Sequence, residues 1–195
     1  MIRECTAEDA ERICLVVNEA AEKAYKGVIP SDCWHEPYMP LDEVRREMAE
    51  MRFFGWDAEG GQDARPRRNL IGVMGYQPLG EVTLVRHAYV LSTRQGEGIG
   101  GKLLDYLVGY PPEAGRRRPD QDGFARRVRS PAATLPSSGR LLVGTWKVNA
   151  GAIRFYERRG FRRLGDEESQ ELLRRYWRIS ERQRETSLVL GVDLQ

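Results

Sequence analysis

The chain has 195 residues, of which 41% are hydrophobic and 31% charged, and its formal net charge is +2 at pH 7. These values are ordinary for a globular protein, and so small a net charge gives no reason to expect nucleic acid as a partner. No apolar run approaches the roughly 18 residues of a membrane helix. The first residues, MIRECTAEDAER, are charged from the third onward, unlike a secretory signal. We therefore expect one cytoplasmic domain over residues 1–195, with a sizeable core and no membrane association.

Cysteine and histidine are scarce in the chain. The three cysteines, Cys5, Cys14 and Cys33, make neither an even disulfide set nor a CxxC metal pair, so we expect reduced thiols. Only His35 and His87 are available as imidazole ligands. We therefore expect no metal site.

The N-terminal quarter predicts a strand and two helices. A short strand is expected at residues 2–4, followed by Thr6-Ala-Glu-Asp9, which resembles a capping box at the start of a helix over 7–24. Apolar residues then recur at helical spacing. Glycine and three prolines predict a loop over residues 25–40, and a second helix is expected near 41–51.

Strands dominate the middle of the chain. Three strand-like runs, separated by short turns at Gly60-Gly61 and Pro78-Leu-Gly80, are expected to be antiparallel: 52–57, 69–77 and 82–91. The third run leads directly into a glycine-rich loop, and a helix over 101–108 leaves that loop. The remaining predicted elements are a strand at 141–148, a helix at 150–159 ended by Gly160, a polar helical stretch at 166–183 and a strand at 186–192.

Residues 111–139 interrupt this pattern. The segment is rich in Pro, Gly, Ser and Arg and has no sustained hydrophobic period. We interpret it as a flexible insertion on the surface of one domain, because regular structure is expected again directly after it. Its arginines would suit nucleic acid or an acidic protein, but Phe124 is the only aromatic residue among them, so nucleic acid is not expected.

The glycine-rich stretch RQGEGIGGKLL, residues 94–104, fits three phosphate-binding patterns. From Gly96 it fits the dinucleotide fingerprint G-x-G-x-x-G and most of the P-loop G-x-x-x-x-G-K; from Gln95 it fits the coenzyme A turn Q/R-x-x-G-x-G/A. A P-loop needs Ser or Thr after its lysine, and Leu103 stands there. A dinucleotide fold needs an acid ending a second strand about 20 residues on, and RRRPDQDG is no such strand.

The third pattern has a companion downstream, NAGAIRFYERRGF, residues 149–161. Together the two motifs resemble the signatures of the GNAT superfamily of coenzyme A-dependent N-acetyltransferases, and the loop YKGVIPSDCWHEPYM is similar to one prokaryotic group of them. The resemblance covers nearly the whole chain, with 111–139 as an insertion. It implies an α/β (α+β) GNAT fold: a mixed, mostly antiparallel twisted sheet with a splayed parallel strand pair and helices on both faces.

The resemblance also implies a site for acetyl-CoA between the strands at 82–91 and 141–148. Backbone groups of one strand would pair with the pantetheine arm, and the glycine loop would bind the pyrophosphate at a helix N-terminus. The implied residues are Tyr89, Val90, Leu91, Gln95, Gly96, Glu97, Gly98, Ile99, Gly100, Gly101, Asn149, Ala152 and Tyr156. Glu97 departs from the usual basic residue, so we expect it to face solvent, with Arg94 and Lys102 supplying positive charge.

Two of these residues have alternative interpretations. Asn149 would hydrogen-bond the pantetheine chain, or it is simply a helix N-cap. Tyr156 is the expected general acid for the leaving thiolate, and its alternative is a buried aromatic residue. The general base stays open between His87, Glu81 and a water chain, since a lone histidine in a strand is commonly structural.

The acceptor is expected to be a small-molecule or peptide primary amine, attacked directly in a ternary complex. The candidate acceptor residues are Trp34, His35, Glu36, Tyr38 and Trp146, where aromatic rings with a carboxylate would suit a cation. In the alternative function, the same fold would hold acyl-CoA as a sensor or scaffold without turnover. The C-terminal strand of such folds is often found at a dimer interface, which makes a homodimer a partner to test.

Overall fold

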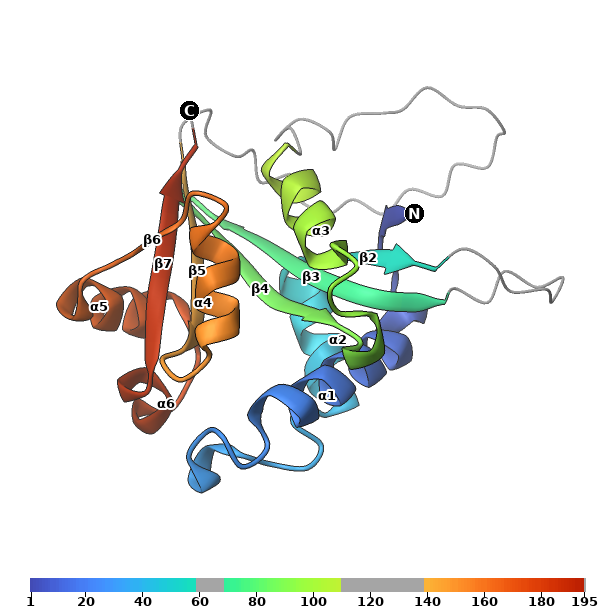
Figure 1. Cartoon of the computed structure of the whole chain (residues 1–195), viewed down its shortest axis with the longest axis horizontal. Coiled ribbons are helices and arrows are strands. Elements are labelled where there is room, and N and C mark those ends of the chain that lie inside the picture. Colours follow the sequence, from blue (N-terminus) through green and yellow to red (C-terminus); the bar gives the residue numbers. More distant parts are fainter. Residues whose placement is uncertain (59–68, 110–138, 195) are drawn as a thin grey trace, which may run out of the picture.

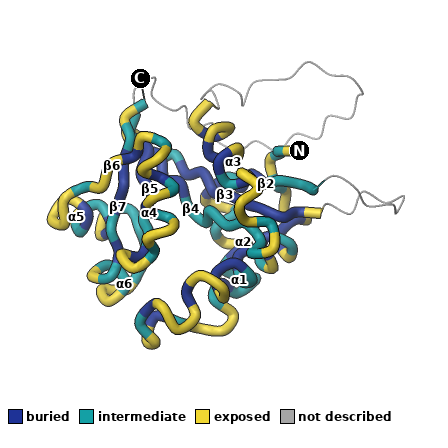
Figure 2. The backbone as a smooth tube through the Cα atoms, in the orientation of Figure 1, coloured by how far each residue is buried: buried dark blue, intermediate teal, exposed yellow. Residues whose placement is uncertain are grey.

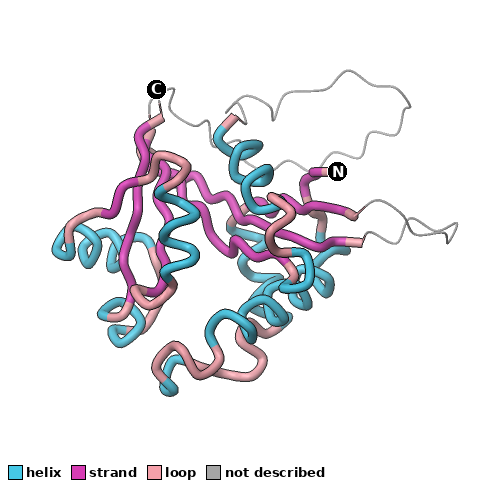
Figure 3. The backbone as a smooth tube through the Cα atoms, in the orientation of Figure 1, coloured by secondary structure: helices cyan, strands magenta, loops and turns pink. Residues whose placement is uncertain are grey.

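A computed structural model describes residues 1–58, 69–109 and 139–194 of the chain (Figures 1 and 3). The strands are β1 (Ile2–Glu4), β2 (Arg52–Asp57), β3 (Leu70–Leu79), β4 (Val82–Val90), β5 (Arg140–Trp146), β6 (Arg162–Arg163) and β7 (Ser187–Asp193). The α-helices are α1 (Ala10–Tyr25), α2 (Leu41–Glu50), α3 (Ile99–Val108), α4 (Ala150–Glu157), α5 (Asp166–Tyr176) and α6 (Glu181–Glu185). Short 3-10 turns occur at η1 (Ala7–Asp9), η2 (Ser31–Cys33) and η3 (Ser92–Arg94).

The strands described form one sheet in the order β1-β2-β3-β4-β5-β7-β6. All neighbours are antiparallel except β4 and β5, which run parallel. A parallel pair needs a long crossover, and the chain that contains α3 supplies it. The predicted fold class, a mostly antiparallel α/β sheet with one parallel pair, is therefore confirmed.

Helices cover both faces of the sheet. On one face, α3 and α4 share a buried cluster with β-strand residues such as Met74, Val85 and Val143. On the other face, α1 and α2 pack on Phe53 and Val73, and α5 packs on neighbouring strands. The strands are accordingly mostly buried while the outer faces of the helices are exposed (Figure 2). β4 and β5 lie in the middle of this sheet. The edges by which they face each other are accessible only where the two strands separate.

Leu142 on β5 is a direct test of this packing. Its side chain is fully buried beside Leu84 and Leu173, so Leu142→Ala is expected to lower the free energy of unfolding by about 2–5 kcal/mol. Urea denaturation measures the change. Leu15→Ala removes the same atoms from a side chain that is 47% exposed and should change stability by less than about 0.5 kcal/mol. Equal losses in the two variants would contradict the packing described.

Some predicted boundaries differ from those observed. The predicted helix at 166–183 is two helices, because Ser180 starts a second one with a capping box: its Oγ accepts from Gln183 N at 3.2 Å, and Gln183 Oε1 accepts from Ser180 N at 2.8 Å. The helix predicted at 101–108 begins two residues earlier, at Ile99. The turn at Gly60-Gly61 lies outside the described residues, as does the insertion except for its last residue.

Candidate active site

The parallel strands β4 and β5 separate halfway along their length. Their register runs from Val82↔Arg140 to Val85↔Val143 and stops there, whereas β4 continues to Val90 and β5 to Trp146. The two strands therefore meet near the C-terminus of the chain and diverge away from it (Figure 1). Past Val85, the β5-facing edge of β4 has no strand partner within the described residues. Such an edge offers backbone groups to an extended ligand.

A β-bulge in β4 lies at the start of this divergence. Between the pairs Gly75↔Arg86 and Val73↔Tyr89, β4 has one residue more than β3. The extra residue leaves His87 with a φ of +48°, a conformation that non-glycine residues rarely adopt. Gly75 accommodates the bulge, because a Cβ there would lie 3.0 Å from the carbonyl oxygen of Arg86. A bulge re-aims side chains, and here the side chains of both Arg86 and His87 reach Glu47 on α2, while the His87 ring also stacks on Phe53 of β2.

A cavity of about 270 Å³ occupies the divergence. Val85, Ala88 and Tyr89 of β4 line one side, and Val143, Gly144 and Trp146 of β5 line the other. Helices contribute Glu43 and Glu47 from α2, Ala152 and Tyr156 from α4 and Leu173 from α5. The cavity thus brings together residues from α1, α2, β4, β5, α4 and the C-terminal part of the chain, at the point where the sheet is open.

Tyr156 reaches this cavity from α4. The helix starts at Asn149, whose Oδ1 accepts from Ala152 N at 3.0 Å, and its buried face carries Ile153 and Tyr156. Tyr156 is only 4% exposed. Burial raises the pKa of its hydroxyl well above the ordinary value, and the nearby Tyr25 adds to the effect. The phenol therefore stays protonated across the neutral range and can donate a proton.

Three further phenols cluster beside Tyr156. The ring centroid of Tyr25 lies 5.5 Å from that of Tyr38 and 6.4 Å from that of Tyr89. Trp146 Nε1 donates to the Tyr38 hydroxyl at 3.4 Å. Burial raises the pKa of all three phenols, that of Tyr25 to about 12. This cluster ties α1 and the loop after it to both diverging strands.

Asn149 has two hydrogen-bonding roles. Besides capping α4, its Nδ2 donates to the Tyr25 hydroxyl at 3.3 Å. The N-cap interpretation of Asn149 is thus visible in the structure, and the amide is at the same time linked to the phenol cluster. Tyr25 was not among the predicted site residues, because its position at the end of α1 gives no local signal of a contact 124 residues away.

The side chains of Glu47, Arg86 and His87 form an ionic cluster on the α2 side of the cavity. Arg86 contacts both carboxylate oxygens of Glu47, at 2.9 and 3.2 Å, and His87 Nε2 lies 3.3 Å from Glu47 Oε2. The His87 ring stacks on Phe53, with centroids 5.7 Å apart. Burial disfavours ionisation of Glu47, but hydrogen bonds and attraction from His87 and Arg86 hold its pKa below the ordinary value.

The glycine loop has the backbone geometry of an anion site. Gly96 and Gly98 have φ values of +86° and +76°, and Gly98 is the N-cap of α3. Lys102 N donates to Gly98 O at 3.0 Å, so the amides of the three helical residues before it have no acceptor inside the helix. A helix N-terminus with free amides attracts anions. The Gln95 amide instead donates to Ser92 O, at 3.4 Å.

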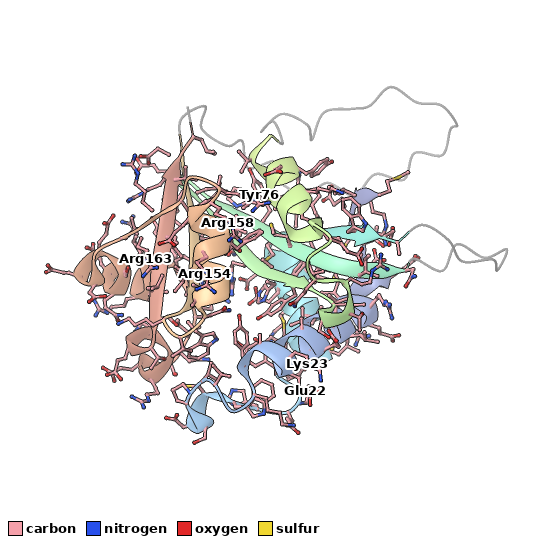
Figure 4. All side chains as sticks on the ribbon, in the orientation of Figure 1. Glu22, Lys23, Tyr76, Arg154, Arg158 and Arg163 are labelled. Atoms are coloured by element: carbon pink, nitrogen blue, oxygen red, sulfur yellow. The ribbon has the colours of Figure 1, made fainter. Side chains whose placement is uncertain are left out.

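The charged side chains around this loop are engaged with protein partners. Glu97 is exposed, as expected, and makes two hydrogen bonds with Arg94, at 2.6 and 2.8 Å. The Lys102 ammonium lies 5.1 Å from the centre of the Trp56 ring. On the same side of the sheet, Figure 4 shows Arg154 and Arg158 projecting from α4. In this conformation Arg94 is paired with Glu97, and Lys102 lies over the Trp56 ring.

The candidate acceptor residues divide into two groups. His35, Tyr38 and Trp146 line the cavity. Trp34 does not: it stacks on Tyr38 with ring centroids 5.5 Å apart and donates to Glu36, which in turn pairs with Lys26 at 2.7 Å. Trp34 therefore fits the role of a loop anchor.

Other cavity residues were missed by sequence reasoning. Glu43 and Glu47 lie one turn apart on α2 and both line the cavity, as does Trp177, whose ring packs against Gly144. Glu81, a candidate base, is exposed at the β3–β4 turn, where β4 is still paired with β5, and does not line the cavity.

Metal-ligating clusters and membrane-spanning helices are both lacking among the described residues. These residues contain no group of three or more His, Cys, Asp or Glu side chains arranged to hold a metal ion. None of their helices combines the length and the apolar character needed to cross a membrane.

The sequence and the fold were compared with those of known proteins. Residues 61–163, 103 of the 195, match the family model of the acetyltransferase (GNAT) domain. No curated protein matches the sequence significantly.

Solved structures share the fold over nearly the whole chain. The PaiA N-acetyltransferase of Thermoplasma acidophilum, solved with coenzyme A, superposes with a TM-score of 0.63 at 16% identity, covering 98% of this chain and 96% of that one. A GNAT-family acetyltransferase of Staphylococcus aureus Mu50 gives 0.63 at 15% identity, covering 100% and 99%. The ribosomal-protein-S18-alanine N-acetyltransferase of Escherichia coli gives 0.57 at 14%, covering 100% and 94%. The chain belongs to the GNAT family and is an acetyl-CoA-dependent acyltransferase.

Proposed function

We propose that the chain, acting as one domain, transfers an acetyl group from acetyl-CoA to a primary amine by direct attack in a ternary complex. The observation that supports this most is the cavity at the divergence of β4 and β5. It begins where the pairing of Val85 with Val143 ends, and it contains both Tyr156 and His87. A proton donor and a proton acceptor therefore share one opening in the sheet.

Acetyl-CoA would bind along the divergence. The amides from Gly96 to Gly101 would take the pyrophosphate at the positive end of α3, because these groups have no helical acceptors. Backbone groups of Tyr89 and Val90, on the open edge of β4, and of Leu91, directly after β4, would pair with the pantetheine arm. Ala152 lines the cavity from α4, and Asn149, which caps that helix, would hydrogen-bond the pantetheine arm.

Tyr156 would supply the proton that the leaving group needs. When the amine nitrogen attacks the thioester carbonyl, the carbon–sulfur bond breaks and the sulfur leaves as a thiolate. The Tyr156 phenol, kept protonated by burial, donates its proton to that sulfur. The tyrosinate then regains a proton, which the new amide nitrogen must lose.

His87 would remove the first proton from the acceptor. A primary amine is protonated at neutral pH and must become neutral before its lone pair can attack. His87 lines the cavity, whereas Glu81 does not, so the placement favours His87 between these two residues.

Turnover with an amine panel tests the function. Purified protein is mixed with acetyl-CoA and, in separate reactions, with a diamine, an amino acid, an aminoglycoside and peptides with a free N-terminus or lysine. The release of coenzyme A is followed with a thiol reagent, and product mass identifies the acetylated amine. Amine-dependent release supports the proposal. Binding of acetyl-CoA with no release above hydrolysis for any amine would favour the alternative, a non-catalytic acyl-CoA sensor.

Glu97→Gln is expected to tighten coenzyme A binding several-fold at low salt. The change removes a carboxylate beside the proposed pyrophosphate site and releases Arg94 from its ion pair. Calorimetric titration with coenzyme A measures the effect, which should shrink at high salt because both groups are exposed. Glu168→Gln, which breaks a comparable pair with Arg140 far from the loop, is the control. Weaker binding in Glu97→Gln would contradict the placement of the pyrophosphate.

A further inference from the structure

Glu47 makes contacts that a solvent-facing helix residue does not need. Its carboxylate lies 17% exposed between two basic side chains that come from adjacent positions of β4. Arg86 binds both of its oxygens, and a second acceptor, Gln77 Oε1, lies 3.2 Å from Arg86 Nη1. The carboxylate is therefore fixed in position and kept ionised, with one oxygen, Oε2, directed at His87 Nε2.

The backbone of His87 has a strained conformation, and this conformation accompanies the contact of its side chain with Glu47. A non-glycine residue rarely adopts a positive φ, and such a conformation persists where the surroundings over-determine it. Without the extra residue, adjacent residues of β4 would point to opposite faces of the sheet. With it, Arg86 and His87 both reach Glu47, and Phe53 fixes the plane of the imidazole. Such strain often coincides with function.

We propose that Glu47 is a positioning residue for acetyl transfer, which holds His87 by Nε2 so that Nδ1 is the nitrogen that receives the acceptor's proton. The proposal rests on the function proposed above. A carboxylate only accepts hydrogen bonds, so Nε2 carries the hydrogen and donates it to Glu47. The lone pair then lies on Nδ1, as in other sites where a second partner fixes the tautomer of a histidine.

The proton balance of this step is simple. His87 Nδ1 accepts one proton from the ammonium group, which gives a neutral amine and an imidazolium. The negative charge of Glu47 stabilises that imidazolium at 3.3 Å. After transfer, the proton leaves from Nδ1 to solvent and the neutral tautomer is restored. Arg86 stays protonated throughout and prevents Glu47 from taking the proton itself.

Several charged groups lie near His87. Among them, the negative charge of Glu47 favours the protonated form of His87. Glu47 and Glu43 from α2 and Arg86 from β4 line the same cavity, as does Arg178 after α5, which pairs with Glu50 at 2.8 Å. Removing the charge of Glu47 leaves His87 beside Arg86 without the bridging carboxylate. Protonation of His87 then becomes harder, so its titration should move to lower pH.

The first arm of the test is a nuclear magnetic resonance titration. The chain has only two histidines, His35 and His87, so two imidazole signals are expected and His35→Gln assigns them. In Glu47→Gln, the titration midpoint of His87 should fall by about one pH unit, and the share of the Nε2–H tautomer should fall with it. Glu43→Gln, one turn earlier on the same helix and also lining the cavity, is the matched control and should change both much less. An unmoved midpoint in Glu47→Gln overturns the proposal.

The second arm is the pH profile of kcat/KM for the amine found in the panel. In Glu47→Gln the acid limb should shift by the same amount as the His87 titration, and the plateau should fall about tenfold. The ionisation of the amine affects both profiles equally, because the same amine is used throughout, so it does not contribute to the difference between wild type and variant. A shifted titration with an unchanged profile overturns the proposal, since Glu47 would then be structural. Glu47→Asp keeps the charge and should restore part of the lost kcat/KM. His87→Gln should abolish the acid limb of the pH profile.

Two checks keep the outcomes separate. Melting temperatures show whether each variant folds; if Glu47→Gln does not, Glu47→Asp carries the comparison of the His87 titration with the pH profile, and His87→Gln shows whether the acid limb depends on His87. Wild-type protein without turnover on any amine refutes the proposed function, and the role of Glu47 falls with it. Normal turnover that is indifferent to Glu47→Gln refutes the role of Glu47 alone.

Discussion

Replacing Tyr156 by phenylalanine is expected to lower kcat for acetyl transfer by about 10²–10⁴-fold, with little change in the affinity for acetyl-CoA. The reason is that the variant keeps the buried ring but lacks the proton that the leaving thiolate needs. Tyr156 lines the cavity and its phenol is protonated at neutral pH, so the proposed function assigns it the donation of that proton. Steady-state kinetics with the amine from the panel, together with calorimetric titration, measure both quantities.

Tyr76→Phe is the matched control for this prediction. Tyr76, labelled in Figure 4, is another buried tyrosine of the same core cluster. It is 3% exposed and is not among the residues that line the cavity. Its replacement should leave kcat nearly unchanged. If Tyr156→Phe keeps full kcat, the phenol is only a core residue and another donor protonates the thiolate. If both variants lose activity equally, the loss reflects damage to the core.

Alkaline unfolding is the second large effect that we expect. Tyr25, Tyr38, Tyr89 and Tyr156, four of the eight tyrosines, all have a raised pKa in the folded state, chiefly because they are buried. Their neutral forms stabilise the fold fully below pH 10, the ordinary pKa of a phenol, and that contribution is lost as pH rises through the folded-state values, about 12 for Tyr25. Tyr25 alone accounts for a loss on the order of 2–3 kcal/mol.

Tyrosinate absorbance and circular dichroism, recorded in one pH titration, measure this effect. About half of the tyrosine signal should appear only as the protein unfolds, in a cooperative step above pH 10. Tyr25→Phe should weaken that step, because one buried phenol no longer resists ionisation. Tyr176→Phe, at a partly exposed position on α5, should not. Tyrosines that all titrate near pH 10 in a folded protein would contradict the cluster.

The features predicted from sequence are those encoded locally. The glycine loop and the segment from Asn149 to Phe161 carry their information in short, fixed spacings, which led to the family and the fold class. The helix caps at Thr6 and Asn149 could also be predicted from the sequence, because a cap depends on residues three positions apart. The cap at Ser180 has the same signature and was overlooked, which is why one helix was predicted where two are found.

The architecture of the cavity could not be read in the same way. The strand VTLVRHAYV has no glycine at the bulge, and the residue that makes room for it, Gly75, belongs to the neighbouring strand. Glu47 is one of several acids on a polar helix, and only tertiary packing selects it. Tyr25 joins Asn149 across 124 residues of sequence. In each of these three cases, the contact forms because the fold brings distant residues together, and the local sequence pattern does not indicate it.

Amide hydrogen exchange with and without acetyl-CoA tests the central claim most directly. The account predicts that acetyl-CoA slows exchange at the amides of Gly96 to Gly101 and along the open edge of β4 after Val85, where pairing with β5 ends. ATP and NAD at the same concentration should leave these amides unchanged. Protection confined to other segments, or protection of the glycine loop by ATP or NAD but not by acetyl-CoA, would contradict the proposed site and the catalytic roles built on it.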